Sequence, residues 1–394
     1  MSNSDTLAIA FLQLRRWLFD DVLPLWHAQG VDWENGGFHE KLDHDARVVA
    51  GIPRRTRVVA RQIYSFAAAG RMGWHGDWNS AVDHGALSLF EDCIKSDGLV
   101  ISTYTADKSS TNQGFDLYDH AFALFALSEL AQRGGYADHA ANAASLMLKT
   151  MNGRYLAPMG GWLDSDEGLN LLRSNPHMHL LEAFLALGTS TGMPCWLDEA
   201  NLLVKLALKF FVSPATGAVH EYFDLEWSRL EDERGRIVEP GHQFEWSWLI
   251  RKWQAQTKLN DLAADAAAEK LCFIGENYGV TKAGLTFDEL WDNLTPKLMT
   301  SRTWPQTERV KACLSQAEFA TSRSTKRLWE DKATQAIMGI LRFAHPTGHR
   351  GLWYDRFLAD GSVQIEPAPA SSLYHIMCAA EVTNDYLAQR LQSE

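Results

Sequence analysis

The segment GAVHEYFDLEWS, residues 217–228, has a pattern that occurs six times along the chain and decides the fold. It begins with Gly, continues with aromatic or apolar residues alternating with acids, and ends in a polar turn, which is typical of a short strand or hairpin. The other copies are GGFHEKLDHDARV at 36–48, GLVISTYTADKSS at 98–110, GGWLDSDEG at 160–168, GLTFDELWDN at 284–293 and GLWYDRFLADGS at 351–362. From Gly37 through Gly98, Gly161, Gly217 and Gly284 to Gly351, the spacings are 61, 63, 56, 67 and 67 residues. Such regularity indicates an internal repeat.

The intervals between these segments have apolar residues at helical spacing and room for two helices each. The predicted helices are 57–69 and 78–95, 118–133 and 136–151, 177–188 and 197–211, 242–257 and 262–278, and 306–320 and 326–343. A helix at 6–27 opens the chain and one at 370–390 closes it. An open solenoid would need polar caps at both ends, but the first helix, LAIAFLQLRRWLFDDVLPLW, is strongly apolar. We therefore predict an all-α (α/α)6 barrel with short β-hairpins between helix pairs, formed by residues 1–394 as one domain.

Composition and charge narrow the function classes. The net charge is −12 and Lys and Arg form no basic stripe, so neither nucleic acid nor an anionic membrane is an expected partner. The five cysteines are scattered without a C-x-x-C motif, which favours a reducing compartment over a disulfide framework. The N-terminus has no signal-peptide pattern, and no apolar stretch approaches the ~20 residues that span a bilayer. We expect a cytoplasmic protein, either a monomer or a homodimer.

The stretch EPGHQFEWSW at 239–248 supplies the first candidate for chemistry. Pro240 and Gly241 end a loop, and the helix that follows has His242 and Glu245 on one face of its first turn. An imidazole beside a carboxylate suits general acid–base catalysis. A lone histidine more often caps or packs, so His242 needs companions. In a helical ring, the first helix after each hairpin is the expected inner one, and the N-terminal ends of the inner helices meet at one mouth.

The first turns of the expected inner helices supply these companions. Arg61 lies in an apolar helix, where a buried Arg needs an anionic or polar partner such as Asp119. His179 shares a face with Glu182, as His242 does with Glu245. The full set is Arg57, Arg61, Asp116, Tyr118, Asp119, Asn175, His177, His179, His242, Glu245, Arg302, Trp304, Glu308 and His375.

The sequence has no signature of a metal, a cofactor or a nucleophile. His179, Glu182, His242, Glu245 and His375 are possible metal ligands, but they form neither H-E-x-x-H nor a tight cluster, so we expect no metal. There is no phosphate-binding Gly loop, dinucleotide fingerprint or G-x-S-x-G motif, so no cofactor is expected. A glycosidase of this architecture would use paired carboxylates, whereas the inward set is richer in His. This favours proton transfer next to a carbonyl group.

Six motifs resemble those of the N-acylglucosamine 2-epimerase superfamily, most closely its mannose isomerase branch of aldose–ketose isomerases. The motifs are ARQIYSF, LYDHAFAL, RSNPHMHLLEAFLAL, PGHQFEWSWL, RTWPQTE and SSLYHI, in the family's order over nearly the whole chain. The resemblance implies an (α/α)6 barrel. It also implies that His242 and His375 are the two acid/base histidines and that Glu245 supports His242.

The same resemblance implies how a sugar would bind. Arg61 matches the arginine near O1 and O2, and Trp304 matches the aromatic wall. Asn175 and His179 match residues that bind hydroxyl groups. Tyr118, Asp119 and Arg57 are further substrate-binding candidates, although Arg57 has no firm counterpart in the family pattern.

The activity implied is the interconversion of D-mannose and D-fructose, with D-lyxose/D-xylulose and related aldoses as further candidate substrates. In this hypothesis His242 assists ring opening, and His375 carries the C2 proton to C1 through a cis-enediol that Arg61 and His179 stabilise. A 2-epimerase acting on N-acylglucosamine or cellobiose would use the same two histidines, so the sequence leaves both reactions open. It also leaves open which histidine opens the ring. A non-catalytic carbohydrate-binding barrel and a barrel glycosidase are further alternatives.

Overall fold

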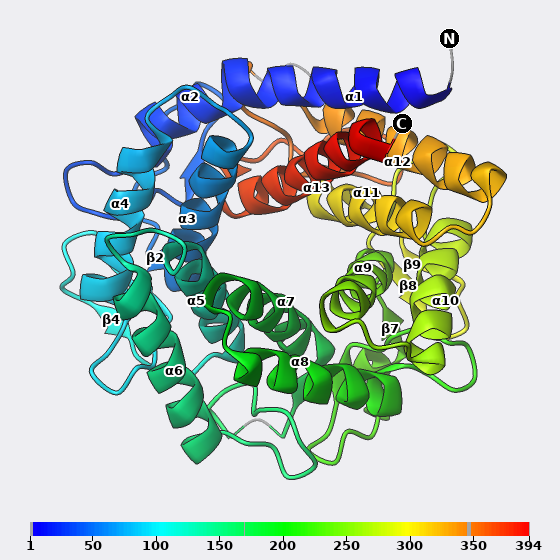
Figure 1. The fold of residues 1–394 in the computed structure, drawn as a ribbon. Coiled ribbons are helices and arrows are strands. Elements are labelled where there is room, and N and C mark those ends of the chain that lie inside the picture. The colour runs from blue at the N-terminus through cyan, green and yellow to red at the C-terminus, as the bar shows by residue number, and fades with distance from the viewer. Residues whose placement is uncertain (1–2, 169, 345–347, 394) are drawn as a thin grey trace.

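Six helices that are buried on nearly every side form the inner wall of a closed ring in the computed structural model, which describes residues 3–168, 170–344 and 348–393 (Figure 1). Each packs against the next, and the last packs against the first. Helices buried all round belong to the centre of a large fold. The inner helices are α3 (Thr56–Arg71), α5 (Leu117–Leu130), α7 (Ser174–Thr191), α9 (Pro240–Thr257), α11 (Thr303–Glu318) and α13 (Ser371–Ser393). The protein is the predicted (α/α)6 barrel.

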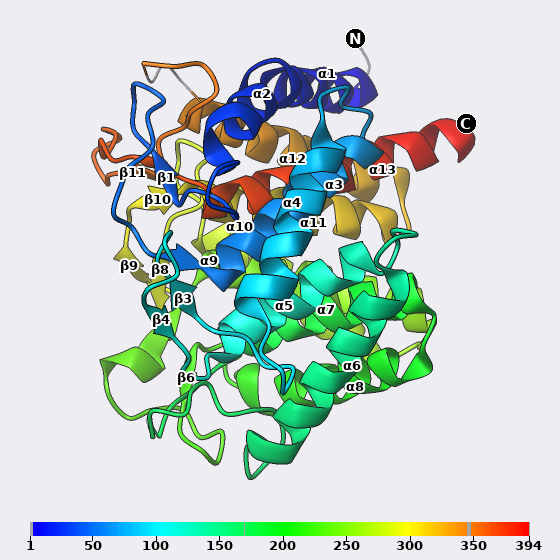
Figure 2. The same ribbon diagram turned by 90° about the vertical axis from the view of Figure 1, so that its left-hand side faces the viewer.

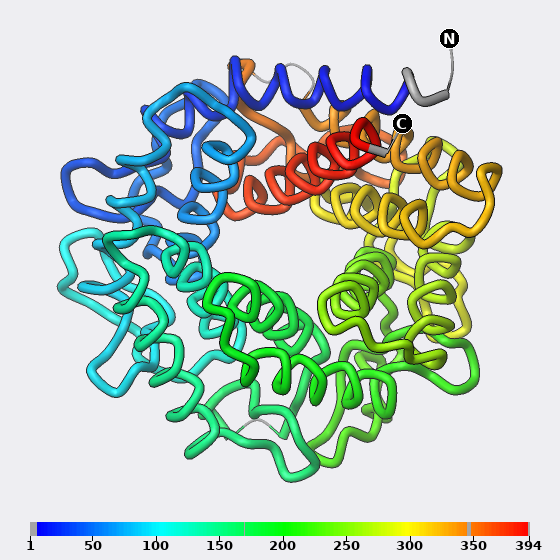
Figure 3. Tube along the Cα trace, in the orientation of Figure 1, coloured from blue at the N-terminus to red at the C-terminus, as the bar shows by residue number. Residues whose placement is uncertain are grey.

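The outer helices pack with one apolar face against this wall (Figures 1 and 3). They are α1 (Asn3–Trp17), α4 (Trp78–Ser88), α6 (Ala137–Arg154), α8 (Pro194–Leu206), α10 (Leu262–Tyr278) and α12 (Arg323–Phe343). Helix α1 contacts α12 and α13, so the start of the chain pairs with its end, as predicted. No helix in the described part of the chain is long and apolar enough to cross a membrane.

Several outer helices end in a π turn, directly before the segment that contains the anchor glycine. These turns are η1 (Leu18–Val22), η2 (Trp26–Gly30), η3 (Leu89–Cys93) and η4 (Ala207–Phe211), with a short α2 (Leu23–Leu25) between the first two. At equivalent places, the amides of Val31, Ile94 and Val212 donate to the carbonyl five residues earlier at 3.2, 2.9 and 3.0 Å. The turns thus repeat with the internal period, and they extend the predicted helix at 6–27 to residue 30.

Small antiparallel sheets join neighbouring repeats at one end of the barrel (Figure 2). Their strands are β1 (Lys41–Leu42) with β12 (Ala368–Pro369); β2 (Arg54–Arg55), β3 (Thr103–Tyr104) and β4 (Thr111–Asn112); β5 (Leu172–Arg173) with β6 (Tyr222–Phe223); β7 (Ile237–Val238), β8 (Glu289–Trp291) and β9 (Pro296–Leu298); and β10 (Ser301–Arg302) with β11 (Arg356–Phe357). Lys41 pairs with Pro369, so this sheet closes the ring. Across five of the six anchor glycines the predicted hairpin is a single bridge, as between Ile94 and Val100, and the described residues include no such bridge across Gly351.

The anchor glycines make the tight turns that start these segments. Gly98 and Gly217 have φ of 85° and 79°, a region that side chains with a Cβ rarely enter. Gly351 is different, because its φ is not positive and a Cβ there would clash with the carbonyl oxygen of Asp21. Gly351 is therefore needed because the backbone at Asp21 lies so close to it, whereas the other five anchor glycines are needed for their positive φ.

Candidate functional site

A polar cavity of about 250 Å³ lies at the end of the barrel where the inner helices begin. The first two turns of these helices, the residues just before them and Asp355 supply its wall, because each small sheet leads the chain into an inner helix at this end. The lining residues are Arg61, Tyr118, Asn175, His179, Glu239, His242, Glu245, Arg302, Trp304, Asp355, Ser371, Ser372 and His375. Five members of the predicted set are absent from this lining: Arg57, Asp116, Asp119, His177 and Glu308. Glu308 still contacts His375 at 2.9 Å, and Nε2 of His177 accepts a hydrogen bond from the Trp162 amide.

His242 is held by a carboxylate that the sequence analysis did not assign to it. Its Nδ1 atom lies 2.9 Å from Oε2 of Glu221, which precedes β6, and 3.9 Å from Oε2 of Glu239. Glu221, and not the predicted Glu245, makes the direct contact with His242, although the charge of Glu245 also raises the pKa of His242. Three residues along α9 place Glu245 one turn deeper in the barrel, where its Oε1 atom is 3.7 Å from Nδ1 of His179.

The charges around His242 favour the imidazolium. Burial lowers the pKa of His242, but the carboxylates of Glu221 and Glu239 outweigh it and raise this pKa to about 10. Nδ1–H donates to Glu221, so Nε2 is the ring nitrogen left for a ligand in the cavity. At neutral pH His242 is a cationic proton donor.

His375 also has a carboxylate beside its Nδ1 atom, but its surroundings lower its pKa instead of raising it. Its Nδ1 atom lies 2.9 Å from Oε1 of Glu308. Burial and then the positive charges of Arg61 and Lys311 hold the pKa of His375 well below its ordinary value. At neutral pH His375 is therefore a neutral imidazole, whose Nε2 lone pair can accept a proton.

Trp304 lies against both histidines. Its ring centroid is 5.0 Å from that of His242 and 5.8 Å from that of His375. A Cβ at position 241 would clash with the Trp304 ring, so Gly241 is needed for α9 and α11 to approach this closely. One indole thus forms a wall between a proton donor and a proton acceptor.

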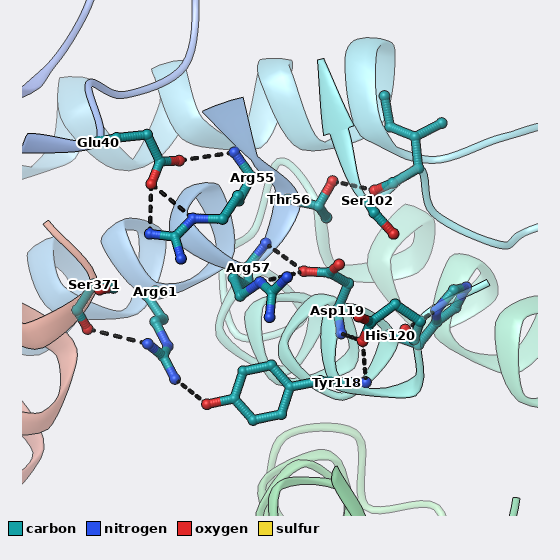
Figure 4. A network of polar contacts seen from close by, with 12 residues as sticks. Glu40, Arg55, Thr56, Arg57, Arg61, Ser102, Tyr118, Asp119, His120 and Ser371 are labelled. Atoms are coloured by element: carbon teal, nitrogen blue, oxygen red, sulfur yellow. Dashed lines mark hydrogen bonds and ion pairs between the residues drawn. The ribbon is translucent and has the colours of Figure 1, made fainter. Parts of the chain in front are cut away.

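Arg61 presents a guanidinium that no carboxylate in the described residues neutralises. Its Nη2 atom donates to the Tyr118 hydroxyl at 2.7 Å and its Nη1 atom to the Ser371 carbonyl at 3.3 Å (Figure 4). The guanidinium carbon is 4.1 Å from the ring centroid of Phe122. Aromatic rings and neutral oxygens hold the charge in place, which leaves it available to an anionic group of a ligand.

Arg57 and Asp119 form an ion pair with each other. This corrects the predicted pairing of Asp119 with Arg61, and it places the two residues apart from the cavity where they were predicted to bind substrate. Nε of Arg57 lies 2.9 Å from Oδ1 of Asp119, a fully buried carboxylate on α5, so Asp119 does not pair with Arg61 (Figure 4). Arg57 lies one helical turn before Arg61 and faces another cavity, of about 390 Å³, which Asp116, Asp164 and Arg173 also line. The pair joins α3 to α5 outside the candidate site.

The floor of the cavity is a layer of buried carboxylates. Nδ1 of His179 lies 3.4 Å from Oε2 of Glu182, which also accepts a hydrogen bond from the Tyr374 hydroxyl. Burial lowers the pKa of His179 to about 4. Neither oxygen of Glu245 has a hydrogen-bond partner, and burial together with Glu308 raises the pKa of Glu245 well above its ordinary value. Burial thus favours the neutral form of the Glu245 carboxyl beside the cavity.

Two groups of side chains have donor atoms close enough to bind a cation. The ligand atoms of His179, Glu182 and Glu245 lie within 4.8 Å of one another. Those of Glu221, Glu239 and His242 do so as well. Nitrogen and oxygen donors of this kind suit several divalent metals, so the expectation of metal-independent chemistry stays a prediction.

Glu221 belongs to a set of acids that the sequence analysis missed and that the repeat could have revealed. Glu40, Asp164, Glu221, Asp288 and Asp355 each follow an anchor glycine by three or four residues. Each accepts a hydrogen bond from a residue at the start of an inner helix: Arg55, Arg173, Ser174, Arg302 and Ser372, respectively. The alternating acids of the repeat therefore fix the first turns of the inner helices, and Glu221 also holds His242.

Comparisons with known proteins agree with this architecture. The family model described as N-acylglucosamine 2-epimerase (GlcNAc 2-epimerase) matches residues 36–379. A protein named mannose-6-phosphate isomerase from Rhizobium meliloti (strain 1021) is 37% identical over 386 residues, covering 95% of this chain and 97% of its own. A D-mannose isomerase from Pseudomonas cannabina pv. alisalensis is 28% identical, covering 59% of this chain and 58% of its own.

Solved structures show the same fold. A D-mannose isomerase structure superposes with a TM-score of 0.79 at 19% identity, covering 95% of this chain and 96% of its own. The cellobiose 2-epimerase from Bacillus thermoamylovorans B4167 superposes with a TM-score of 0.83 at 19% identity, covering 95% and 98%. At these identities the likeness carries the fold alone.

Proposed function

The chain belongs to the N-acylglucosamine 2-epimerase family of sugar isomerases and epimerases, and we propose that it is an aldose–ketose isomerase converting D-mannose to D-fructose. The observation that carries the proposal is the pairing of His242 and His375 around Trp304 in opposite charge states. A charged imidazole donates a proton and a neutral one accepts a proton, which are the two roles that aldose–ketose isomerisation needs.

Ring opening is the proposed task of His242. As the bond between C1 and the ring oxygen breaks, the imidazolium gives its Nε2 proton to that oxygen. The neutral imidazole then takes the proton of the O1 hydroxyl as the aldehyde forms. Glu221, 2.9 Å from Nδ1, stabilises the charged form before and after the cycle. This assigns ring opening to His242, a point that the sequence left open.

Transfer of the carbon-bound proton is the proposed task of His375. Its neutral Nε2 removes the C2 proton, and the electron pair left on C2 forms the C1–C2 double bond while O1 becomes an oxyanion. A proton passes from O2 to O1, the imidazolium returns its proton to C1, and the C2 carbonyl of the ketose forms. Arg61 is the cation available for the oxyanion, and a pre-positioned donor of this kind commonly contributes ~3 kcal/mol to the barrier reduction. His179, the other residue predicted to stabilise the enediol, has a pKa of about 4 and its Nδ1 atom faces Glu182, so its Nε2 atom is an acceptor for a hydroxyl group.

A 2-epimerase is the second candidate, because a specific feature of the site favours it. His242 and His375 approach the cavity from two different helices, α9 and α13. Two bases that face one carbon from two sides could remove a proton on one side and return it on the other. The product then separates the reactions, because isomerisation gives a ketose and epimerisation gives the 2-epimer.

The charges at the mouth favour a sugar without a phosphate group. Arg302 already pairs with Asp288 at 3.0 Å and with Glu239 at 3.5 Å. Glu239 and Asp355 add negative charge to the lining. Binding of a phosphate commonly uses several uncommitted cations, whereas Arg61 is committed to the reacting end in the proposed mechanism.

The experiment that tests the proposal measures D-fructose and D-glucose formed from D-mannose by the purified protein, with D-mannose 6-phosphate in a parallel reaction. We expect D-fructose from D-mannose and a kcat/KM at least tenfold lower for the phosphate ester. The His375→Gln variant is the control and should form neither product. If the wild-type protein converts none of these sugars, the non-catalytic carbohydrate-binding barrel becomes the better account.

A further inference from the structure

Lys311 is a buried cation behind the candidate site. It lies on α11 one turn after Glu308 and is fully buried, so it does not touch the cavity. Its Nζ atom is 2.6 Å from Oε2 of Glu308 and 3.9 Å from the ring centroid of Trp248. An ammonium group is costly to bury, and even a good ion pair often fails to recover that cost. Stability alone therefore gives a poor reason for a lysine here.

The contacts of Glu308 link Lys311 to the reacting histidine. One carboxylate oxygen of Glu308 faces Nδ1 of His375 at 2.9 Å and the other faces Nζ of Lys311 at 2.6 Å. Burial raises the pKa of Glu308, and Lys311 counteracts that rise. An ionised Glu308 accepts the Nδ1 proton of His375 and so fixes the tautomer whose Nε2 atom is free.

We call the series of contacts from Lys311 through Glu308 to His375 the relay. Charged and titratable groups on the surrounding inner helices lie close to it. Lys311 is close to Glu182 on α7, Glu245 on α9 and Cys378 on α13, as well as to Glu308. Arg61 on α3 and His179 on α7 face His375. The pair of His242 and Glu221 has a different setting, since Glu239 adds a second carboxylate there and Ser174 is the partner that donates to Glu221. A buried lysine is thus placed behind one histidine of the site and not behind the other.

We propose that Lys311 is a positioning residue for proton transfer: its charge keeps Glu308 ionised and the imidazole of His375 neutral, so that His375 acts as the base. The inference rests on the proposed function, because it gives His375 that role. Lys311 acts through Glu308 and does not contact the substrate.

The test compares the pH dependence of kcat/KM in wild type, Lys311→Met and Lys311→Gln, for whichever sugar interconversion the wild type performs. Without the lysine, the pair formed by Glu308 and His375 takes up one proton more readily. Such a pair titrates as a unit. The acid limb of the profile should therefore move to higher pH, by about 1–3 units, as expected for loss of a neighbouring charge. Gln keeps a hydrogen-bond donor but drops the charge, so both variants should shift alike.

Lys332→Met is the matched control. Nζ of Lys332 lies 2.6 Å from Oε2 of Glu276, the same distance as in the Lys311 pair, but on outer helix α12 and away from the cavity. This variant should keep the wild-type pH profile. An equal shift in Lys332→Met would overturn the proposal, and so would an unshifted profile in Lys311→Gln accompanied only by a lower melting temperature.

A nitrogen-15 NMR titration of the intact wild-type protein reports the protonation state and tautomer of the His375 ring. It requires neither folded variants nor enzymatic turnover. We expect a neutral ring protonated on Nδ1 at neutral pH. An imidazolium signal at that pH contradicts the inference. Absence of any sugar conversion by wild type, with the neutral Nδ1 tautomer present, would instead contradict the proposed function and leave the relay intact.

Discussion

The Nδ1 atom of His242 lies 2.9 Å from Oε2 of Glu221, a residue 21 positions earlier in the chain, in the segment that follows Gly217. A loop carboxylate therefore sets the charge of a residue in the first turn of the next inner helix. With Glu239 as the second acid near this ring, the site gives His242 a positive charge and leaves His375 neutral.

Glu221→Gln should move the alkaline limb of the pH–rate profile to lower pH. The substitution removes the nearest negative charge, so the pKa of His242 falls from its value of about 10 and the proton donor is lost earlier as the pH rises. The measurement is kcat from pH 6 to 10.5. A limb that stays in place would show that His242 is not the donor.

The stability of the wild-type protein should fall as the pH rises from about 6.5 to about 10, because the folded protein binds a proton on His242 that the unfolded chain releases near its ordinary pKa of 6.5. The favourable contribution is fully present below that window and lost above it. His242→Gln removes this contribution, so the fall should be smaller in the variant. Denaturant unfolding at several pH values measures it. Parallel curves for the two proteins would contradict the assignment.

Glu245→Gln should retain most of the wild-type kcat, whereas Glu245→Ala should lose about 10²-fold or more. The amide resembles a neutral carboxylic acid in shape and in having a donor, and Ala leaves a cavity in the floor. The Gln variant should also be at least as stable as wild type, because Glu245 has no hydrogen-bond partner to lose. Infrared difference spectra should show the carbonyl band of a protonated carboxylic acid that disappears in the Gln variant. If Gln and Ala are equally inactive, Glu245 works as an ionised group.

Arg57→Met should lower mainly the stability of the protein and Arg61→Met mainly its catalytic efficiency, although the two arginines are one turn apart on α3. Arg57→Met removes the ion-pair partner of the buried Asp119 carboxyl, and we expect a loss of about 1–3 kcal/mol of stability with little change in kcat/KM. Arg61→Met removes the cation proposed for the oxyanion, and we expect kcat/KM to fall about 10²–10³-fold. Melting curves and steady-state kinetics on both variants decide the matter. The reverse pattern would place the substrate in the Arg57 cavity.

The helices and the ring could be predicted because both depend on local periodicity. Each predicted helix lies within a few residues of an observed one, since apolar spacing and the Gly turns fix it locally. The partners of the functional side chains depend instead on ring geometry. Glu221 in the segment before β6 contacts His242 on α9, and Asp119 on α5 contacts Arg57 on α3 and not Arg61, and both contacts depend on how separate elements pack. Lys311, within RVKACL, looks in the sequence like any helical lysine, since its burial is set by tertiary packing.

The acids after the anchor glycines are the signal that the sequence did contain. Glu221, Asp288 and Asp355 occupy equivalent places in three repeats, and each accepts a hydrogen bond at the start of an inner helix. Aligning the six segments on their glycines would have assigned these acids to the mouth. It would not have shown which of them holds a histidine.

The reaction of D-mannose with the purified protein in deuterated water, followed by NMR of the products, tests the proposed isomerisation most directly. We expect D-fructose, with deuterium at C1 to the extent that the proton on His375 exchanges during transfer, and loss of the product in His375→Gln. Formation of D-glucose labelled at C2 without D-fructose would contradict it and establish a 2-epimerase.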